Sequence, residues 1–558
     1  MNSAFEISFV DRGSWGKHFS GIFRPGRIAC DANVAAGYEP GLLGNADRDQ
    51  ALLAGLGDIH GLGRLAGGFS LALFDHRRDR LVLARDAAGS WPLYVHKTGD
   101  GQVLFATELD ALLRRIGQTP DISVPGLHEY LRFLDIAPPR TIYEGVWMVP
   151  AGSALRIGTD TWEEIELASP PVKLPAGYES AVGDIEVRLD TAIRTMADDC
   201  GKTPLAFLSG GIDSALICAL GARSGAVSEA VTVGFSSPGY DESAIAGDIA
   251  RHLGLRHHII RPDPAAFADA FSRTHARADQ PFCDPAGMAT RLAFEFCAAR
   301  GGGVFDGTGA EVLPGVMPAR WRRIAHDWSS RLPRPVRHGI AGALSISPGI
   351  RGYRRLFDFD EPPDLFIRWG GFTARQIGTL TGHPVDLGLT RFYQAHAELR
   401  GQSHLRRNAI LQGQIPPDDR LRQASWATGL PALHPFLAPE VRNLLARLPE
   451  AWCHEPGRPK RILRDLLARH VPAAVWDQPK HGFEFDFRQF MRMHRSMLVD
   501  RYLDDGSSVF DGLLDRQAIR ALLTEWRGGS DRQAFRVWGL LILSAWLAER
   551  AGFTYKAR

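Results

Sequence analysis

The chain has 558 residues, with 45% hydrophobic residues, 23% charged residues and a formal net charge of +2. This length exceeds one ordinary domain and indicates about three domains or two large ones. The composition excludes disordered and fibrous proteins, and the small net charge argues against a protein that coats nucleic acid. The N-terminus lacks a signal-peptide pattern, and the apolar run Val537–Ala548 is too short to span a bilayer. We therefore expect a cytoplasmic protein in which this run forms a buried helix and the six scattered cysteines are reduced, buried thiols.

The first part of the chain, residues 1–168, has the pattern of a β-rich domain. The apolar runs Phe69–Phe74 and Arg80–Arg85 flank a polar turn and predict a hairpin, and Gln102–Ala106 predicts a further strand. Residues 169–178 contain two prolines early, a third shortly after and then a glycine, which interrupt any regular element. They predict a linker between two domains.

The second part, residues 179–558, alternates strands with helices. Helices are predicted from Ser214 onward and over Asp241–Leu253, and the chain from about residue 316 is predicted to be mostly helical. The predicted strands are Pro204–Leu208, Ala230–Phe235, Arg256–Ile260 and Gly303–Asp306. Strands that alternate with helices predict parallel crossovers and a doubly wound α/β sheet.

The segment Leu208–Ser214, with the sequence LSGGIDS, joins the first of these strands to its helix. Glycines let backbone N–H groups turn toward an anion, and the N-terminus of the following helix adds its positive dipole end, so this loop predicts a phosphate site. Asp213 is unusual there, because a carboxylate repels phosphate unless a cation lies between them. Asp213 is therefore a candidate Mg²⁺ ligand. The plain alternative is a glycine turn with a serine cap.

A second candidate loop, Asp306–Glu311, follows the fourth predicted strand and has the sequence DGTGAE. Ligands of open parallel sheets bind at the carboxyl ends of the strands, so Glu311 is expected to face the same cavity as Asp213 and to provide a second metal carboxylate. An ordinary glycine turn is again the alternative.

These motifs resemble a known family. LSGGIDS, VTVGF, YDES, DQPFCDP and VFDGTGAE, in this order, are similar to the synthetase domain of the asparagine synthetase superfamily, and ASWATGLPALHPFL, KRILR and PKHGF continue the likeness. LAGGFSLALFD and ARDAAGSWPLY resemble the glutaminase-type domain of that family. The resemblance implies an N-terminal glutaminase-like (Ntn) αββα domain of α+β type. It further implies a C-terminal α/β ATP-pyrophosphatase domain with a doubly wound parallel sheet and helical additions.

The activity implied by the resemblance is activation of a carboxylate by ATP and Mg²⁺, with release of pyrophosphate and displacement of AMP by an amine. Asp213 and Glu311 would bind Mg²⁺, and these two residues and Lys480 would be catalytic. Lys480 would neutralise charge that develops on the phosphates, although a lysine in such a loop is more typical of a solvated surface. The nucleotide-binding residues carried over from the family are Leu208, Ser209, Gly210, Gly211, Asp213, Ser214, Val233, Asp306 and Gly307.

The sequence departs from the family where the amine donor would be made and bound. The glutaminase nucleophile is a cysteine exposed after removal of Met, whereas position 2 is Asn2 and the first cysteine is Cys30, so we expect no ammonia production from glutamine. Residues that the family carries on the acceptor side are replaced here by Thr308, Val312, Leu433 and Ala438. The ATP-side residues are kept, and the simplest interpretation is a different nucleophile.

Two branches of the family lack the cysteine and close rings, namely the β-lactam and carbapenam synthetases and the lasso-peptide macrolactam synthetases. We predict a lasso-peptide cyclase that activates an Asp or Glu side chain of a precursor peptide and joins it to the N-terminal amine. The expected partners are this peptide, a leader-binding protein and a leader peptidase, with no nucleic acid and no membrane. The alternatives are a β-lactam-type synthetase, an ammonia-dependent asparagine synthetase, a tRNA-modifying adenylating enzyme and a non-enzymatic scaffold.

One further segment, residues 320–355, contains nine arginines, no lysine and a single acid, Asp327. Trp321, Trp328 and Tyr353 lie between the arginines. An exposed basic pair of helices explains this pattern without any function. The functional interpretation is a surface that binds a peptide or another macromolecule.

Overall fold

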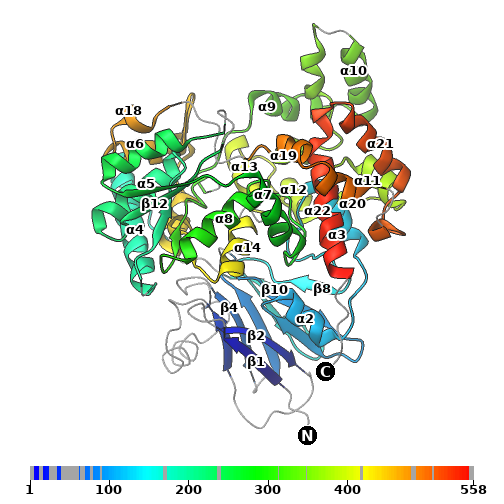
Figure 1. Ribbon diagram of the computed structural model, residues 1–558, viewed down its shortest axis with the longest axis horizontal. Helices are drawn as coiled ribbons and strands as arrows, with labels where there is room; N and C mark the ends of the chain where they lie inside the picture. Colours follow the sequence, from blue (N-terminus) through cyan, green and yellow to red (C-terminus); the bar gives the residue numbers. More distant parts are fainter. Residues whose placement is uncertain are drawn as a thin grey trace.

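The structure is a computed structural model, and the part of the chain that it describes has several gaps. The described residues are 5–11, 17–23, 34–38, 62, 69–75, 79–87, 89, 91–167, 172–200, 202–235, 240–311, 313–346, 349–414, 419–478, 485–504 and 508–551. Figure 1 shows the two-sheet N-terminal domain at one end of the molecule and the larger α/β and helical part at the other. The predicted limits of the two domains stay predictions, because residues 168–171 between them lie outside the described ranges.

The N-terminal domain contains two five-stranded sheets whose neighbouring strands are antiparallel. The first has the order β1 (Phe5–Asp11), β2 (Lys17–Phe23), β7 (Val103–Ala106), β6 (Tyr94–Lys97), β8 (Val146–Met148). The second has the order β10 (Trp162–Glu166), β9 (Ser153–Ile157), β5 (Arg80–Arg85), β4 (Phe69–Asp75), β3 (Val34–Tyr38). The predicted hairpin is thus confirmed as β4 and β5. Side chains from both sheets share one core, which contains Phe74, Leu83, Val95 and Phe105, so the sheets pack face to face.

The C-terminal sheet has five strands in the order β13 (Arg256–Ile260), β12 (Glu229–Val233), β11 (Leu205–Phe207), β14 (Val304–Phe305), β15 (Ala432–Leu433), and every neighbouring pair is parallel. The four predicted strands are confirmed, the one over Arg256–Ile260 with the predicted ends and the other three with slightly different ends. Strand β15 was not predicted because two residues carry no periodic signal. The chain moves outward from β11 in both directions, so the order reverses between β11 and β14. This reversal is the switch point at which doubly wound sheets bind ligands.

Helices cover this sheet and form most of the remaining C-terminal part. Those that follow strands β11, β12 and β13 are α5 (Ile212–Ser224), α6 (Ser243–Leu253), α7 (Pro264–Phe271) and α8 (Gly287–Ala298). The predicted helix from Ser214 therefore begins two residues earlier. The other longer helices are α2 (Leu109–Ile116), α3 (Val124–Phe133), α4 (Tyr178–Asp199), α9 (Arg320–Asp327), α10 (Arg334–Ile346), α11 (Ala374–Thr381), α12 (Arg391–Glu398), α13 (His404–Gln412), α14 (Asp419–Thr428), α15 (Pro439–Leu445), α17 (Arg461–Ala468), α19 (Phe487–Met493), α21 (Arg516–Arg527) and α22 (Ala534–Ala551).

Two of these helices bear on earlier predictions. Helix α22 contains the apolar run and buries Trp538 and Trp546 completely, which confirms a buried helix. Among the described residues, no helix has the length and apolar character needed to cross a membrane.

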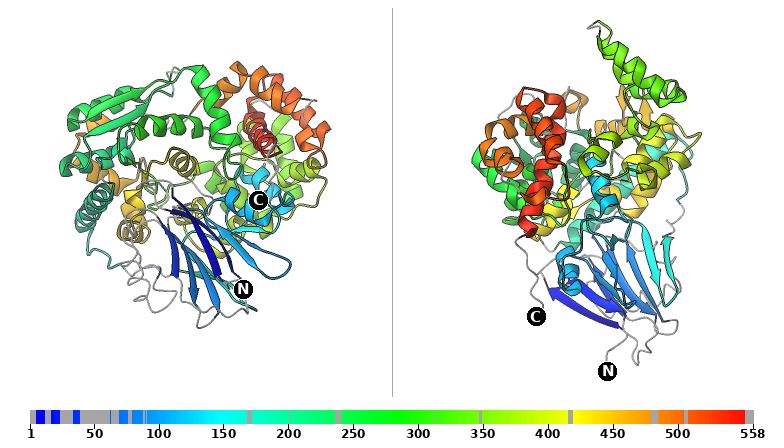
Figure 2. Two further views of the ribbon diagram at one scale, coloured as in Figure 1. Left: turned by 60° about the horizontal axis from the view of Figure 1, so that its bottom comes forward. Right: turned by 90° about the vertical axis from the view of Figure 1, so that its right-hand side faces the viewer.

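The described cysteines are all free and four of the five are buried, whereas Cys30 lies outside the described residues. Helix α10, within the arginine-rich segment, projects away from the body of the protein (Figure 2).

Helix α3 of the N-terminal domain packs deeply against the C-terminal part. The Tyr130 hydroxyl donates a hydrogen bond to the carbonyl of Gly539 in α22 at 2.7 Å. The Arg132 guanidinium donates to the carbonyl of Phe372 at 3.1 Å. Because these partners are buried and more than 200 residues away in sequence, the two parts of the molecule share one continuous core.

Candidate functional site

The LSGGIDS loop has the geometry that its sequence predicts. Strand β11 ends at Phe207 and helix α5 begins at Ile212, so the glycines lie in the tight turn between them. Gly210 has a φ of +72°, and a side chain there would also contact Ile245 at 3.3 Å. A glycine is therefore required at this position.

Hydrogen bonds of two serines stabilise the turn. The backbone N–H of Ser209 donates to Ser214 Oγ at 3.1 Å, and Ser214 Oγ donates to the carbonyl of Gly211 at 3.1 Å. The two hydroxyl oxygens lie 3.2 Å apart. The loop is thus held in a fixed shape at the carboxyl end of the sheet, where the first turn of α5 offers its N–H groups to a ligand.

The second glycine loop lies directly against the first. A Cβ added to Gly307 would lie 2.8 Å from Cβ of Asp213, so only glycine permits this approach. Gly309, with a φ of +94°, would clash in the same way with Leu437 at 2.6 Å. The structure therefore brings the loops after β11 and β14 together at the switch point, as the sequence predicted.

A lysine joins the two predicted metal carboxylates. Lys460 Nζ donates to Asp213 Oδ2 at 2.5 Å and to Glu311 Oε1 at 3.3 Å. Burial by itself would lower the pKa of Lys460, but the charges of Asp213 and Glu311 outweigh burial and raise it, so the ammonium stays charged. Lys460 was not predicted as a site residue. Its only sequence signal was its place in the KRILR motif, and the structure adds a left-handed backbone, with φ of +57°, immediately before α17.

The donor set at this cluster suits a hard divalent cation. Asp213 and Glu311 already converge on one positive atom, and carboxylate oxygens are the protein ligands that Mg²⁺ prefers. The Glu311 side chain is 60% exposed and that of Asp213 is 20% exposed, so both can reach a cation that arrives with phosphates from solvent. The residues present therefore fit a metal–phosphate complex.

A histidine–aspartate pair lies beside the second loop. Asp306, at the end of β14, accepts a hydrogen bond from His434 Nδ1 at 3.0 Å and one from the backbone N–H of Thr308 at 2.8 Å. Burial by itself would raise the pKa of Asp306, but these hydrogen bonds outweigh it and lower the pKa below its ordinary value. Sequence reasoning assigned Asp306 to the nucleotide and gave His434 no role. Their pairing depends on the unpredicted strand β15, which ends at Leu433.

Two other predicted nucleotide-binding residues, Leu208 and Val233, lie at the carboxyl edge of the sheet. Leu208 and Val233 follow or end neighbouring strands at the same edge, and both are buried, with 1% and 6% exposure. They can contribute only a small apolar surface to an adenosine site. Lys480, Val312, Asn2 and Cys30 lie outside the described residues, so the predictions made for them stay predictions.

Comparison with known proteins gives matches over both domains. Residues 187–548 match the family described as asparagine synthase, and residues 51–166 match the glutamine amidotransferase domain. A Mycobacterium tuberculosis protein whose name places it among glutamine-hydrolysing asparagine synthetases is 29% identical over 513 residues, which is 87% of this chain and 77% of that protein. The glutamine-hydrolysing asparagine synthetase 1 of Bacillus subtilis is 21% identical over 519 residues, again 87% of this chain and 77% of the relative.

A shorter match and a structural match complete the comparison. The carboxyethyl-arginine β-lactam synthase of Streptomyces clavuligerus is 31% identical over 210 residues, which is 36% of this chain and 37% of that enzyme. The solved glutamine-dependent NAD⁺ synthetase of Acinetobacter baumannii in complex with ADP is 13% identical, covers 47% of this chain and 64% of that one, and has a TM-score of 0.20.

Proposed function

Because the chain belongs to the asparagine synthase family, whose members are ATP-dependent amide-forming ligases, we propose that it closes a ring within a peptide. ATP would activate an Asp or Glu side chain of a precursor peptide as an acyl-adenylate, with release of pyrophosphate. The N-terminal amine of the same peptide would then attack the activated carbonyl and displace AMP. The observation that carries the activation step is the cluster of Lys460, Asp213 and Glu311 beside a phosphate-type glycine loop.

Each part of this cluster has a task in the activation step. The N–H groups of the Ser209–Gly211 turn and of the first turn of α5 would hold the pyrophosphate oxygens. Asp213 and Glu311 would hold Mg²⁺, which supplies positive charge to the phosphates. The Lys460 ammonium, which lies against both carboxylates, would stabilise negative charge on the leaving group.

The amide-forming step requires a group that accepts a proton from the attacking amine. The pair of His434 and Asp306 is the best-placed candidate, because the lowered pKa of Asp306 keeps it ionised and able to stabilise an imidazolium. This arrangement resembles the carboxylate-oriented histidine of hydrolytic triads in its physical logic. Residue 308 cannot serve as this base, because a threonine hydroxyl stands where the family carries an acid.

The proposal of a peptide substrate rests on the surface of the arginine-rich segment, residues 320–355. Large apolar side chains are exposed along the arginine-rich segment, including Trp328 at 72%, Tyr353 at 61% and Ile346 at 84%. Arg320, Arg331 and other arginines are exposed on the same helices. A surface with apolar and basic side chains suits an extended peptide with acidic residues better than a small metabolite.

The second candidate function is ring closure in a small molecule. It is favoured by the match to the β-lactam synthase of Streptomyces clavuligerus, which is 31% identical over 210 residues. Amidation of aspartate by free ammonia is the third. The proposed peptide cyclase would require two partners, a leader-binding protein and a leader peptidase. It would act in the cytoplasm, since ATP and the precursor peptide are found there.

One experiment separates these candidates. The purified protein is incubated with ATP and Mg²⁺ and with three sets of substrates: synthetic peptides with a free N-terminus and one Asp or Glu, carboxyethyl-arginine, and aspartate with ammonium. Pyrophosphate release identifies the activated acid, and mass spectrometry identifies the product. Ring closure in a peptide removes one water, about 18 Da, without change in chain length. Ammonium incorporation, which lowers the mass by about 1 Da, would contradict the cyclase proposal while leaving the ligase chemistry intact.

A further inference from the structure

Two histidines and an aspartate meet at the base of the projecting arginine-rich arm. His326 and Asp327 are the last residues of α9, and His404 is the first residue of α13. Their ligand atoms all lie within 4.8 Å of one another. We call His326, Asp327 and His404 the His–Asp cluster. Helices α9, α12 and α13 all contact the short helix Pro362–Phe366.

The spacing within the His–Asp cluster is that of a small coordination sphere. Asp327 Oδ1 lies 2.9 Å from His404 Nε2 and 3.2 Å from His326 Nδ1. Ligand atoms bound to zinc at about 2.0–2.1 Å in a tetrahedron are about 3.3 Å apart. The three atoms therefore need only small shifts to surround one ion. Two imidazoles and a carboxylate are also a common ligand set for zinc and related metals.

The imidazoles of His326 and His396 are both partly buried. Burial lowers the pKa of His326, and burial lowers that of the neighbouring His396 to about 4, so both imidazoles are neutral at pH 7. Burial by itself would raise the pKa of Asp327, but hydrogen bonds from His404 and His326 outweigh it and lower the pKa, so this carboxylate is ionised. The positive charge of Arg407 acts in the same direction as burial and lowers the pKa of His326 and His396 further.

Two further nitrogens at the cluster are buried without a hydrogen-bond partner among the described residues, namely His404 Nδ1 and His396 Nε2. The rings of His326 and His396 lie 5.5 Å apart, and Phe366 contacts the rings of His326, His396 and His404. An apolar platform under three imidazoles fixes their orientation and lowers the local dielectric constant. The Asp327 side chain is 48% exposed, which leaves an entry path and room for a water or for His396 as a fourth ligand.

We propose that the His–Asp cluster binds one divalent transition-metal ion of the zinc class through His326, Asp327 and His404. The site would be structural, because it would hold the end of α9 against the start of α13. Asp327 and His404 are 77 positions apart in the sequence, and the chain between them includes α10. The ion would thereby fix the base of the arm that α10 forms. This proposal is independent of the substrate of the enzyme.

Cobalt serves as the probe, because its visible absorption reports coordination by imidazole and carboxylate and does not depend on enzyme activity. Chelator-treated protein is titrated with Co²⁺ in the presence of Mg²⁺, and Zn²⁺ is then added as a competitor. We expect one Co²⁺ per chain with the intense bands of a four-coordinate site, and loss of these bands when Zn²⁺ displaces it. Zn²⁺ should also raise the melting temperature, since it binds the folded state.

Three variants localise the site. His404→Ala and His326→Gln each remove one ligand and should weaken Co²⁺ binding by about 100-fold. His338→Ala is the matched control, because His338 forms a similar pair with Asp360, at 3.3 Å, on the same arm but has no third ligand within the described residues. It should bind Co²⁺ like the unmodified protein. Absence of the bands in the unmodified protein would overturn the proposal. So would folded His404→Ala and His326→Gln variants that bind Co²⁺ as tightly as the unmodified protein.

Discussion

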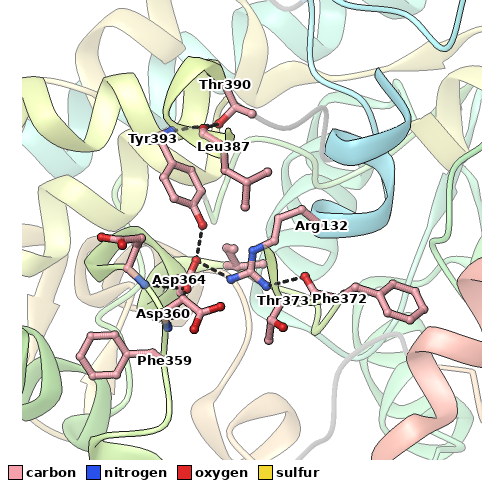
Figure 3. A network of polar contacts seen from close by, with 12 residues as sticks. Arg132, Phe359, Asp360, Asp364, Phe372, Thr373, Leu387, Thr390 and Tyr393 are labelled. Carbon is pink, nitrogen blue, oxygen red and sulfur yellow. Dashed lines mark hydrogen bonds and ion pairs between the residues drawn. The ribbon is translucent and has the colours of Figure 1, made fainter. Parts of the chain in front are cut away.

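Two clusters in this protein pair one cation with acidic side chains, and they differ in how far their side chains reach solvent. The closed cluster consists of Arg132, Asp364 and Tyr393 (Figure 3). Asp364 accepts hydrogen bonds from the Arg132 guanidinium and the Tyr393 hydroxyl, and from the backbone N–H groups of Asp360 at 3.1 Å and Glu361 at 2.9 Å. Arg132, Asp364 and Tyr393 side chains are all nearly inaccessible to solvent.

The open cluster consists of Lys460, Asp213 and Glu311. Its ammonium is as deeply buried as the guanidinium of Arg132, but Glu311 extends into solvent. Lysine also presents a single point charge on a flexible chain, whereas arginine offers a rigid fork of donors. The open cluster can therefore exchange its internal ion pairs for a metal and phosphates, and the closed cluster cannot exchange anything without unfolding around it.

Exposure of the partners separates buried charges that stabilise the fold from buried charges that serve function. When every carboxylate oxygen of a buried ion pair accepts hydrogen bonds, removal of one partner leaves a buried charge unpaired. The main effect of such a pair on stability is the free-energy penalty of that removal. A buried cation whose partner reaches solvent is held in place for a ligand. Variants at the two clusters should therefore change different measurements. Three predictions test this separation, and a fourth concerns a buried carboxylate outside both clusters.

The largest effect is expected from Asp364→Ala. It would leave the Arg132 guanidinium buried without its carboxylate and should lower the free energy of unfolding by about 3–5 kcal/mol. Urea denaturation measures it. Asp184→Ala is the control, since the pair of Asp184 and Arg188 is a surface contact between successive turns of α4 and should contribute less than about 0.5 kcal/mol. A loss below about 1 kcal/mol in Asp364→Ala would remove the distinction between the clusters.

The next effect concerns a buried carboxylate that belongs to neither cluster. Asp279 is 1% exposed, receives the Tyr94 hydroxyl at 3.3 Å and has Arg422 3.7 Å away. Burial raises its pKa to about 7, so between about pH 4 and pH 7 the folded protein holds a proton that the unfolded chain has lost. Stability should therefore fall as pH rises through this window.

The change attributable to Asp279 should be roughly 2–4 kcal/mol between pH 4.5 and pH 8. The side chain of Asp279→Asn cannot ionise, so the free energy of unfolding of this variant should lack this part of the pH dependence. Relative to the unmodified protein, the variant should therefore be more stable at pH 8 than at pH 4.5. Urea denaturation at the two pH values measures both slopes. Parallel slopes would show that Asp279 is ionised in the folded protein and paired as fully as Asp364.

The third prediction concerns the open cluster. Asp213→Ala should lower ATP–pyrophosphate exchange at least about 100-fold, because the site loses a carboxylate that is expected to hold the metal against the phosphates. The free energy of unfolding should change much less than in Asp364→Ala, since Lys460 keeps Glu311 as a partner. Near-normal exchange in the folded variant would contradict the role of Asp213 in activation, and the Asp184→Ala control should show unchanged exchange.

The contrast between the clusters also explains what could be predicted from the sequence. The turn at Ser209–Gly211 and the acid at Asp213 were predicted because glycine, serine and a following helix are local features. The approach of Glu311 to Asp213 followed from the rule that parallel strands end at one edge. Both loops lie where these local and topological signals place them.

The remaining contacts depend on segments far apart in the chain. Lys460 reaches Asp213 across 247 residues, and Arg132 meets its partner Asp364 across the boundary between the two domains. No periodicity or motif indicates such pairs, because several dozen arginines and acids have similar local sequences. The His–Asp cluster is of the same kind: His326 and Asp327 were noted only as part of a basic stretch, and His404 was not noted.

The smallest expected effect is that of Tyr393→Phe, which removes one of the four hydrogen bonds to Asp364 and leaves Arg132 paired. Loss of a buried hydrogen bond to a charged group should lower the free energy of unfolding by about 1.5–3 kcal/mol, with a value near the lower end because three donors remain. The ring itself stays, so its contact with Phe133, at 6.3 Å between centroids, is retained and no cavity forms. ATP–pyrophosphate exchange should not change. A drop in exchange without a drop in stability would mean that the closed cluster communicates with the nucleotide site, and the assignment of Arg132, Asp364 and Tyr393 to stability alone would be wrong.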